Sequence, residues 1–257
     1  LRARAGRPLL EMPSEVYSRM NERIAASGGL HARIVTETLE ADRKYVTTQH
    51  VWLDGLGRAR LDVETAFLLD PPPGARVLDA CVAPGGKAAH LLERTPDLEL
   101  VGVDSDGGRL TRVRENFARL GVSATLIEAD AGQPDGWWDG RPFDAVLVDA
   151  PCSATGVLRR HPDIKLRRRP EDLPALTVTQ SRILRGVWPC LRPGGKLLYA
   201  TCSILPTENQ LQMEAFLASH PDAMREPLRA GVARDDGQIL PGEDGMDGFY
   251  YACARKK

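Results

Sequence analysis

The sequence predicts an α/β fold: a doubly wound, mostly parallel sheet over residues 66–257, preceded by a small α+β appendage over residues 1–65. Two observations predict it. After residue 75, short continuous runs of Val, Ile and Leu alternate with stretches of helical periodicity, which is typical of a parallel sheet covered on both faces. The Asp-Pro-Pro-Pro-Gly turn at 70–74 can be neither helix nor central strand, so we place the start of the larger unit beside it.

The individual elements follow from the same patterns. The strands expected in the larger unit cover 76–80, 99–104, 123–130, 143–149 and 195–201, and a last strand at 248–254 is expected to be antiparallel and at or near an edge. Helical spacing is found over 87–94, over 108–120 with Gly121 as C-cap, and over 208–219 with Pro206 at the first turn. In the appendage we expect a helix over 13–26 capped by Ser14, and strands over 33–39 and 44–53.

The composition excludes several classes of protein. Of the 257 residues, 42% are apolar and 27% charged, which indicates a water-soluble, core-forming protein. Lys plus Arg is 34 against 35 for Asp plus Glu, so the overall charge of −1 gives no argument for nucleic acid binding. No apolar run could span a membrane, and no signal peptide is visible.

Cysteine usage and the first residue bound the context of the chain. Its five cysteines are scattered, with no Cys-x-x-Cys pair and no His-rich cluster, so neither a disulfide framework nor a metal site is expected. We therefore expect a cytoplasmic protein. We also expect a monomer. The chain begins at Leu1 rather than at Met, which predicts a piece of a longer protein.

Four successive predicted strands end in a carboxylate: Asp79, Asp104, Asp130 and Asp149. A single Asp in this place is usually a turn or cap residue, but four in succession indicate a ligand site. In an open parallel sheet, ligands bind beyond the carboxyl ends of the strands, where the strand order reverses. Asp104 is placed to bond ribose hydroxyls, and Asp130 to read an adenine amino group.

A glycine-rich loop follows the first of these strands. It comprises Cys81, Val82, Ala83, Pro84, Gly85, Gly86 and Lys87. The loop matches neither the phosphate-loop pattern nor the dinucleotide fingerprint, although its glycines would let the backbone approach a ligand and the following helix N-terminus attracts a carboxylate. Ribose, adenine and an amino-acid tail without phosphate predict S-adenosylmethionine as cofactor. The alternative is that the two glycines only form a tight turn.

Two cysteines follow strand ends on the same face of the predicted sheet. Cys152 lies in a Pro-Cys-Ser sequence directly after Asp149, and Cys202 lies in a Thr-Cys-Ser sequence after the next strand. A lone cysteine is more often a small buried apolar residue, which we expect of Cys190 and Cys253. Two cysteines beside a carboxylate favour nucleophilic chemistry instead. The residues alone do not decide which of the two attacks.

Three segments carry a resemblance to a known family: 77–87 (VLDACVAPGGK), 146–165 (VLVDAPCSATGVLRRHPDIK) and 197–209 (LLYATCSILPTEN). They resemble the RNA cytosine carbon-5 methyltransferases of the NOL1/NOP2/Sun family, and the middle segment is most similar to bacterial members that methylate small-subunit ribosomal RNA. The resemblance covers about residues 70 to 257. It implies a Rossmann-like class I methyltransferase that transfers a methyl group from S-adenosylmethionine to RNA, with ribosomal RNA as substrate.

The resemblance also implies roles for single residues. Residues 81–87 would form the cofactor loop, Asp104 and Asp130 would bind ribose and adenine, and Asp149 would lie between cofactor and base. Cys202 corresponds to the nucleophile, which adds to carbon 6 of cytosine, and Cys152 to a second cysteine that assists product release.

A basic stretch follows the first of these cysteines. Its predicted RNA-binding residues are Arg159, Arg160, His161, Lys165, Arg167, Arg168 and Arg169. Such a patch supplies phosphate contacts with little sequence readout. The alternative is a solvated helix surface.

The chain also departs from the family pattern. Val82 stands where the family has Ala, and the region before residue 70 lacks both the expected RNA-binding lead-in and the helical RNA-binding domain that related bacterial enzymes carry upstream. The appendage is therefore only a candidate RNA-binding element. Two alternatives stay open: a methyltransferase of the same fold with another substrate and structural cysteines, and a non-catalytic RNA-binding or ribosome-assembly module that retains a cofactor pocket.

Overall fold

The chain divides into two compact units, Leu1–Glu64 and Thr65–Lys257, and we treat each by itself. The computed structural model describes residues 29–40, 43–54, 59–61, 68–95, 97–228, 236–243 and 247–257. Within these ranges, no helix combines the length and the apolar character needed to cross a membrane.

The first unit contains an antiparallel sheet of three strands in the order β1-β2-β3. These are β1 (Gly29–Glu40), β2 (Arg43–Asp54) and β3 (Ala59–Leu61). β1 and β2 pair along their whole length, from Gly29 opposite Asp54 to Glu40 opposite Arg43. The two strands expected at 33–39 and 44–53 are confirmed and extend further at both ends. The helix expected over 13–26 lies outside the described residues.

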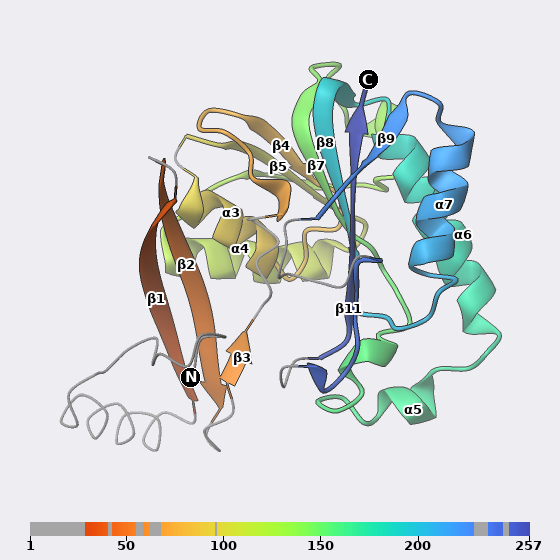
Figure 1. The fold of residues 1–257 in the computed structure, drawn as a ribbon, viewed down its shortest axis with the longest axis horizontal. Coiled ribbons are helices and arrows are strands. Elements are labelled where there is room, and N and C mark those ends of the chain that lie inside the picture. Colours follow the sequence, from red (N-terminus) through yellow and green to blue (C-terminus); the bar gives the residue numbers. More distant parts are fainter. Residues whose placement is uncertain are drawn as a thin grey trace. The chain divides into compact units, whose positions relative to one another are not determined.

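The second unit is built on a sheet of eight strands (Figure 1), in the order β10-β11-β8-β7-β4-β5-β6 with β9 paired to β11. The strands are β4 (Arg76–Asp79), β5 (Glu99–Asp104), β6 (Thr125–Glu128), β7 (Phe143–Asp149), β8 (Leu191–Thr201), β9 (Ala223–Glu226), β10 (Gln238–Ile239) and β11 (Phe249–Lys256). β4 to β8 pair in parallel, and β11 runs antiparallel beside β8. The mostly parallel sheet and the antiparallel last strand are therefore confirmed.

Helices cover both faces of this sheet, as expected of a doubly wound fold: Figure 1 shows α3 and α4 on one side and α6 and α7 on the other. The helices in the described part of this unit are α3 (Gly86–Arg94), α4 (Gly107–Leu120), the short α5 (Ile164–Arg167), α6 (Asp172–Val187) and α7 (Gln210–Ser219). α4 begins where the Asp106 side chain accepts a hydrogen bond from the Arg109 amide at 3.0 Å, and it ends at Gly121 with φ 71°. The predicted C-cap is therefore confirmed.

α7 begins two residues later than the sequence pattern predicts. Residues 206–209 form turns, and the side chains of Glu208 and Asn209 are buried in hydrogen bonds instead of continuing a helix. The expectation of a helix starting at Glu208 is thus wrong because these two side chains have partners elsewhere in the fold.

The strand order fixes the place of a ligand site. β4 lies between β5 and β7, so the chain leaves β4 first to one side and later to the other. This is the point where the strand order reverses, and the carboxyl ends of β4 and β7 border the crevice that forms there. Asp79 and Asp149 end these two strands.

Candidate active site

A cavity of about 470 Å³ lies beyond the carboxyl ends of the parallel strands. Small-molecule sites typically measure about 300–1,000 Å³. The predicted site residues that line it are Cys81, Ala83, Asp104, Asp130, Asp149, Cys152 and Cys202. The remaining residues of the predicted cofactor loop, Val82, Pro84, Gly85, Gly86 and Lys87, are outside this lining.

Gly85 and Gly86 of the loop differ in how closely other atoms pack around them. Gly85 has φ 95°, and a Cβ there would lie 3.0 Å from Cγ1 of Val113 on α4, so the turn and the helix packing require glycine. At Gly86 a Cβ would meet no atom within 4 Å, so the space before α3 is open. A Cβ on Gly102 would lie 2.9 Å from Cγ2 of Val82. The Val82 side chain therefore packs on β5, away from the cavity.

Asp104 is buried at the end of β5 and is held mostly by the protein itself. Its Oδ2 accepts from the Ala83 amide at 3.2 Å, and its Oδ1 accepts from the Asp106 amide at 3.1 Å and from Arg109 Nη1 at 3.5 Å. An ionised carboxylate has about four acceptor sites, so about one remains for a ligand hydroxyl. Arg109 also donates to the Ala83 carbonyl at 2.9 Å and lines the cavity, a role that the sequence analysis missed.

Asp130 follows β6 and is paired across the cavity wall. Its Oδ1 accepts from the Gly132 amide at 2.9 Å, and its Oδ2 forms an ion pair with Arg182 of α6. Arg182 itself lines the cavity. This arginine was not among the predicted site residues because α6 was not predicted.

Asp149 and Lys87 form an ion pair. Lys87 Nζ, from the first turn of α3, lies 2.6 Å from Asp149 Oδ2 at the end of β7, and each side chain is 30% exposed. A charge-assisted bond of this length fixes the orientation of both groups. Lys87 thus orients a carboxylate that lines the cavity, although Lys87 is not part of the lining.

The two cysteines lie in contact, with 3.4 Å between Cys152 Sγ and Cys202 Sγ. The hydrogen bond from the Cys152 thiol lowers the pKa of Cys202, and Lys87 lowers it further against the opposing effects of burial and Asp149. The same hydrogen bond, together with burial, raises the pKa of Cys152 well above its ordinary value. Of the two thiols, Cys202 is therefore the more acidic.

The other three thiols are held in the protonated form. Burial, and then Asp79, raise the pKa of Cys81 well above its ordinary value. Burial also raises the pKa of Cys190 and of Cys253 to about 11 each, and both lie in the core as expected. Because all five cysteines lie in described parts of the chain, Cys202 is the one whose pKa is lowered.

Asp79 lies behind the cavity wall at the end of β4. Burial, and then the nearby Asp149, raise its pKa to about 7. Its Oδ1 accepts a hydrogen bond from the Cys81 amide at 3.3 Å. The sequence marked this carboxylate as a strand end but assigned no role to it.

Several residues of the basic stretch form bonds to other parts of the protein. Asp247, whose side chain is fully buried, pairs with Arg159 at 3.2 Å and with Arg160 at 2.5 Å. The next residue of the same segment, Gly248, donates its amide to the Gly156 carbonyl at 2.9 Å. The two arginines thus tie the turn after Cys152 to the segment before β11.

Two further arginines of the stretch are engaged within the protein. Arg168 donates to the carbonyls of Cys152 and Ser153, at 3.2 Å each. Arg167 pairs with Asp163 at 3.1 Å on the surface. His161, Lys165 and Arg169 complete the predicted RNA-binding set, and all seven of its residues are exposed.

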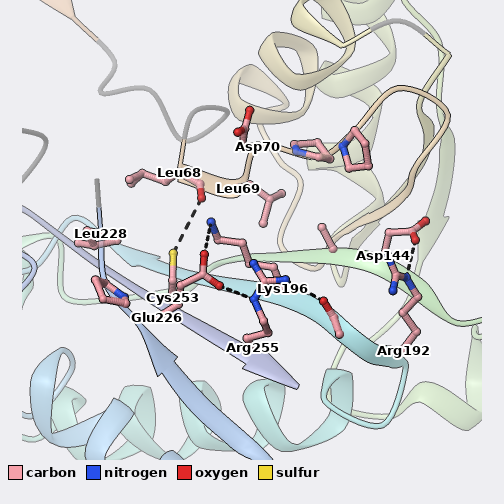
Figure 2. A pocket seen from close by; sticks show the side chains of 15 residues that line it. Leu68, Leu69, Asp70, Asp144, Arg192, Lys196, Glu226, Leu228, Cys253 and Arg255 are labelled. Carbon is pink, nitrogen blue, oxygen red and sulfur yellow. Dashed lines mark hydrogen bonds and ion pairs between the residues drawn. The ribbon is translucent and has the colours of Figure 1, made fainter. Parts of the chain in front are cut away.

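A second cavity, of about 310 Å³, lies at the amino ends of β7 and β8 (Figure 2). Figure 2 shows Lys196 and Arg255 turned toward Glu226, at 3.1 and 2.7 Å. Arg192 pairs with Asp144 at 2.6 Å. These charges neutralise one another, and Cys253 is the lining thiol with a raised pKa, so this cavity offers no reactive group.

No metal site is found in the described ranges, where no three His, Cys, Asp or Glu side chains are grouped so that they could hold an ion.

The solved structures that resemble the chain are methyltransferases or related proteins. NSun6 from Pyrococcus horikoshii, solved with SFG, is 29% identical with a TM-score of 0.66, and the match covers 76% of this chain and 51% of that chain. A methyltransferase homolog protein from the same organism is 25% identical with a TM-score of 0.64, and covers 95% of this chain and 82% of that chain. The Rossmann-like class I methyltransferase fold is thus confirmed.

Curated relatives with higher sequence identity are also methyltransferases. The ribosomal RNA small subunit methyltransferase B of Vibrio cholerae is 54% identical over 189 residues, which are 74% of this chain and 43% of the relative. That of Shewanella oneidensis is 48% identical over 233 residues, 89% of this chain and 54% of the relative. The chain spans about half the length of these relatives. The family model for 16S rRNA methyltransferase RsmB/F matches residues 66–255, and the chain therefore belongs to this family.

Proposed function

We propose that this chain methylates carbon 5 of a cytosine in small-subunit ribosomal RNA, using S-adenosylmethionine and a covalent bond between Cys202 and the base. The observation that carries the proposal is the cysteine pair. Cys202 has a lowered pKa, lies 3.4 Å from the Cys152 thiol, and lines a cavity of cofactor size together with Asp149. The names of the bacterial relatives supply the substrate class.

The cavity fits S-adenosylmethionine in its donor set. Asp104 retains about one acceptor site for a ribose hydroxyl, and Asp130 lies on the wall where an adenine would be read. The N-terminus of α3, which follows the loop, favours a carboxylate. SFG, bound in the related NSun6 structure, is an analogue of this cofactor. When bound, S-adenosylmethionine supplies an electrophilic methyl group.

Nucleophilic attack by Cys202 answers the main chemical difficulty. Carbon 5 of cytosine is a poor nucleophile in an aromatic ring, and a thiolate that adds to carbon 6 turns it into an enamine-like carbon. Asp149, oriented by Lys87, would share a proton with nitrogen 3 and so stabilise the charge that develops on the ring. The base must leave its stack to reach the sulfur, as in other base-modifying enzymes.

Product release requires a base, and we propose Cys152 for this part. Once carbon 5 carries the methyl group, its proton must leave so that the double bond re-forms and Cys202 departs as a thiolate. The first cause of the raised pKa of Cys152 is its hydrogen bond to Cys202. A thioether at Cys202 is a much poorer acceptor than a thiolate, so Cys152 becomes easier to deprotonate at the step that needs a base.

Covalent trapping on RNA that contains 5-fluorocytosine tests the assignment. Cys202→Ala should abolish both methyl transfer and the protein–RNA adduct seen on a denaturing gel. Cys152→Ala should accumulate the adduct with unmodified RNA, because the elimination step is lost. Cys253→Ala, far from the cavity, serves as the matched control and should behave like the wild type.

Other outcomes of the same experiment select the alternatives. An adduct formed by Cys202→Ala but not by Cys152→Ala would reverse the two roles. A folded wild type that binds cofactor but forms no adduct would favour a methyltransferase with another substrate. Calorimetry without any cofactor binding would favour the non-catalytic module.

For the partner surface, we propose that the exposed His161, Lys165 and Arg169 contact RNA phosphates. They lie on the segment that Arg168 attaches to the turn carrying Cys152, which supports a role beside the reacting base. Five free cysteines also suit a reducing compartment, and we propose that the protein acts in the cytoplasm.

A further inference from the structure

A buried carboxylate lies between the two turns that carry the cysteines. Glu208 has no exposed surface. Its Oε2 accepts from Ser153 Oγ at 2.5 Å and from Ser203 Oγ at 2.6 Å. Its Oε1 accepts from the Ser153 amide at 2.8 Å and from Gln180 Nε2 of α6 at 3.1 Å. The two serines are the residues that directly follow Cys152 and Cys202.

These four bonds use the whole capacity of the carboxylate. An ionised carboxylate accepts about four hydrogen bonds, and O–H donors to a charged oxygen form short, strong bonds of about 2.5–2.7 Å. All four donors are neutral groups, so the direction of each bond, rather than a charge pair, fixes the geometry. Glu208 thereby joins the turn after β7, the turn after β8 and α6.

The surrounding backbone leaves these turns little room to shift. The Gly156 amide donates to the Cys202 carbonyl at 2.9 Å, and a Cβ on Gly156 would lie 2.8 Å from that same oxygen. The Tyr199 hydroxyl donates to the Glu208 carbonyl at 2.7 Å, which attaches Glu208 to the buried part of β8. The backbone bond fixes one point of contact between the turns, and the Glu208 carboxylate fixes the orientation of Ser153 and Ser203 beside the two cysteines.

We propose that Glu208 is a positioning residue: by holding Ser153 and Ser203, it keeps the Cys152 thiol within hydrogen-bond distance of the Cys202 sulfur. The inference deepens the proposed function, on which its meaning for catalysis rests, because it concerns the same cysteine pair. The contact itself needs neither RNA nor cofactor. It can therefore be tested apart from methyl transfer.

The test is the rate at which iodoacetamide alkylates Cys202 in the full chain, measured against pH by mass spectrometry of its peptide. The groups that face Cys202 are Cys152, Asp149 and Lys87. Glu208→Gln should raise the pH midpoint of alkylation by about one unit, the size expected for the loss of one hydrogen bond to a charged group. Removal of the negative charge by itself would lower the midpoint, so the sign separates positioning from electrostatics.

The matched control is Glu214→Gln. Glu214 is an exposed carboxylate on α7 that accepts from Gln210 at 2.7 Å, and its replacement should leave the midpoint unchanged. In a Cys152→Ala background, Glu208→Gln should add no further rise, because the thiol through which it acts is gone. A rise of equal size in that background would overturn the proposal.

A weaker variant keeps the test decisive if Glu208→Gln does not fold. Ser203→Ala removes one of the four bonds and should raise the midpoint in the same direction by a smaller amount. An unchanged or lowered midpoint in a variant with native circular dichroism would overturn the proposal. A raised midpoint in a protein that forms no RNA adduct would leave the positioning role standing and contradict only the proposed function.

Discussion

Asp79 shows how one buried carboxyl makes stability depend on pH. It is almost fully buried at the end of β4, and burial and then Asp149 raise its pKa to about 7 from an ordinary 3.8. An unfolded chain releases this proton near the ordinary value, whereas the folded protein holds it to about pH 7. Between these two values the unfolded state binds fewer protons, so stability falls as pH rises and levels off above about pH 7.

Asp79→Asn should remove this pH dependence. From pH 5 to pH 8, the free energy of unfolding of the variant should rise relative to wild type by about 2–3 kcal/mol at most, since each unit of pKa shift is worth about 1.4 kcal/mol. Urea unfolding at the two pH values measures it, with the exposed Asp135→Asn as control. A difference between variant and wild type that stays constant with pH would contradict the raised pKa.

At the level of single residues, the sequence located the strand-end groups and missed their partners. Asp104, Asp130 and both cysteines could be predicted because parallel strands bring their carboxyl ends to one edge. Arg182 and Glu208 could not, because their contacts depend on how α6 and the turn before α7 are oriented. Buried hydrogen-bond partners across the fold leave no periodic signal in the chain.

Among the elements, the segment of residues 159–169 shows what a charge pattern leaves open. Its charge suggested a continuous RNA-binding surface, yet Arg159 and Arg160 neutralise the buried Asp247, which is 88 and 87 residues away in the chain. A basic pattern reports charge but not the partner of each charge. The segment therefore combines an internal attachment with surface exposure.

The exposed part of the segment should govern RNA affinity. Lys165→Gln with Arg169→Gln should weaken RNA binding and reduce the slope of log K against log salt by about one for each residue, while cofactor affinity stays unchanged. Filter binding over a salt series measures this. Arg112→Gln with Arg119→Gln, on the surface of α4, is the matched control. An unchanged salt slope would mean that these residues do not contact phosphates.

A further substitution tests the part of the segment that is paired with Asp247. Arg160→Gln leaves Asp247 with Arg159 alone, and should lower the free energy of unfolding on the order of 1–3 kcal/mol because a buried charged group loses a partner. Urea unfolding measures it. The loss should exceed that for Lys165→Gln, whose side chain is exposed.

The elements themselves were predictable where their pattern was apolar. β7 was predicted with its observed bounds because FDAVLVD is buried along nearly all its length. α6 was not predicted, because the buried Gln180 interrupts its apolar face. Gln180 donates to the Pro151 carbonyl and to Glu208. A polar residue that bonds to the site therefore breaks the apolar periodicity by which the helix could have been predicted.

For the whole molecule, the division into two units separates the proposed chemistry from a candidate RNA-binding part. Every proposed reaction and cofactor residue belongs to Thr65–Lys257, which has its own core and sheet. We propose that the first unit adds RNA contacts. This assigns catalysis to one unit and part of the affinity for RNA to the other.

Expression of residues 65–257 alone tests this division. Because the unit has its own core, the fragment should fold and bind S-adenosylmethionine within about twofold of the affinity of the full chain. Its affinity for ribosomal RNA should be lower. Circular dichroism, calorimetry and filter binding measure the three properties. Equal RNA affinity of fragment and full chain would assign no RNA contact to the first unit.

The attachment through Asp247 and Gly248 has a consequence for the gene. A premature stop codon after residue 246 would still leave every residue of the proposed reaction encoded. Its product would lack the carboxylate that holds Arg159 and Arg160, the contact to Gly156, and β11, which pairs with β8. An uncovered β8 is a site for aggregation. The reading frame must therefore stay intact through the codons for Asp247, Gly248 and β11 for the upstream cysteines to be of use.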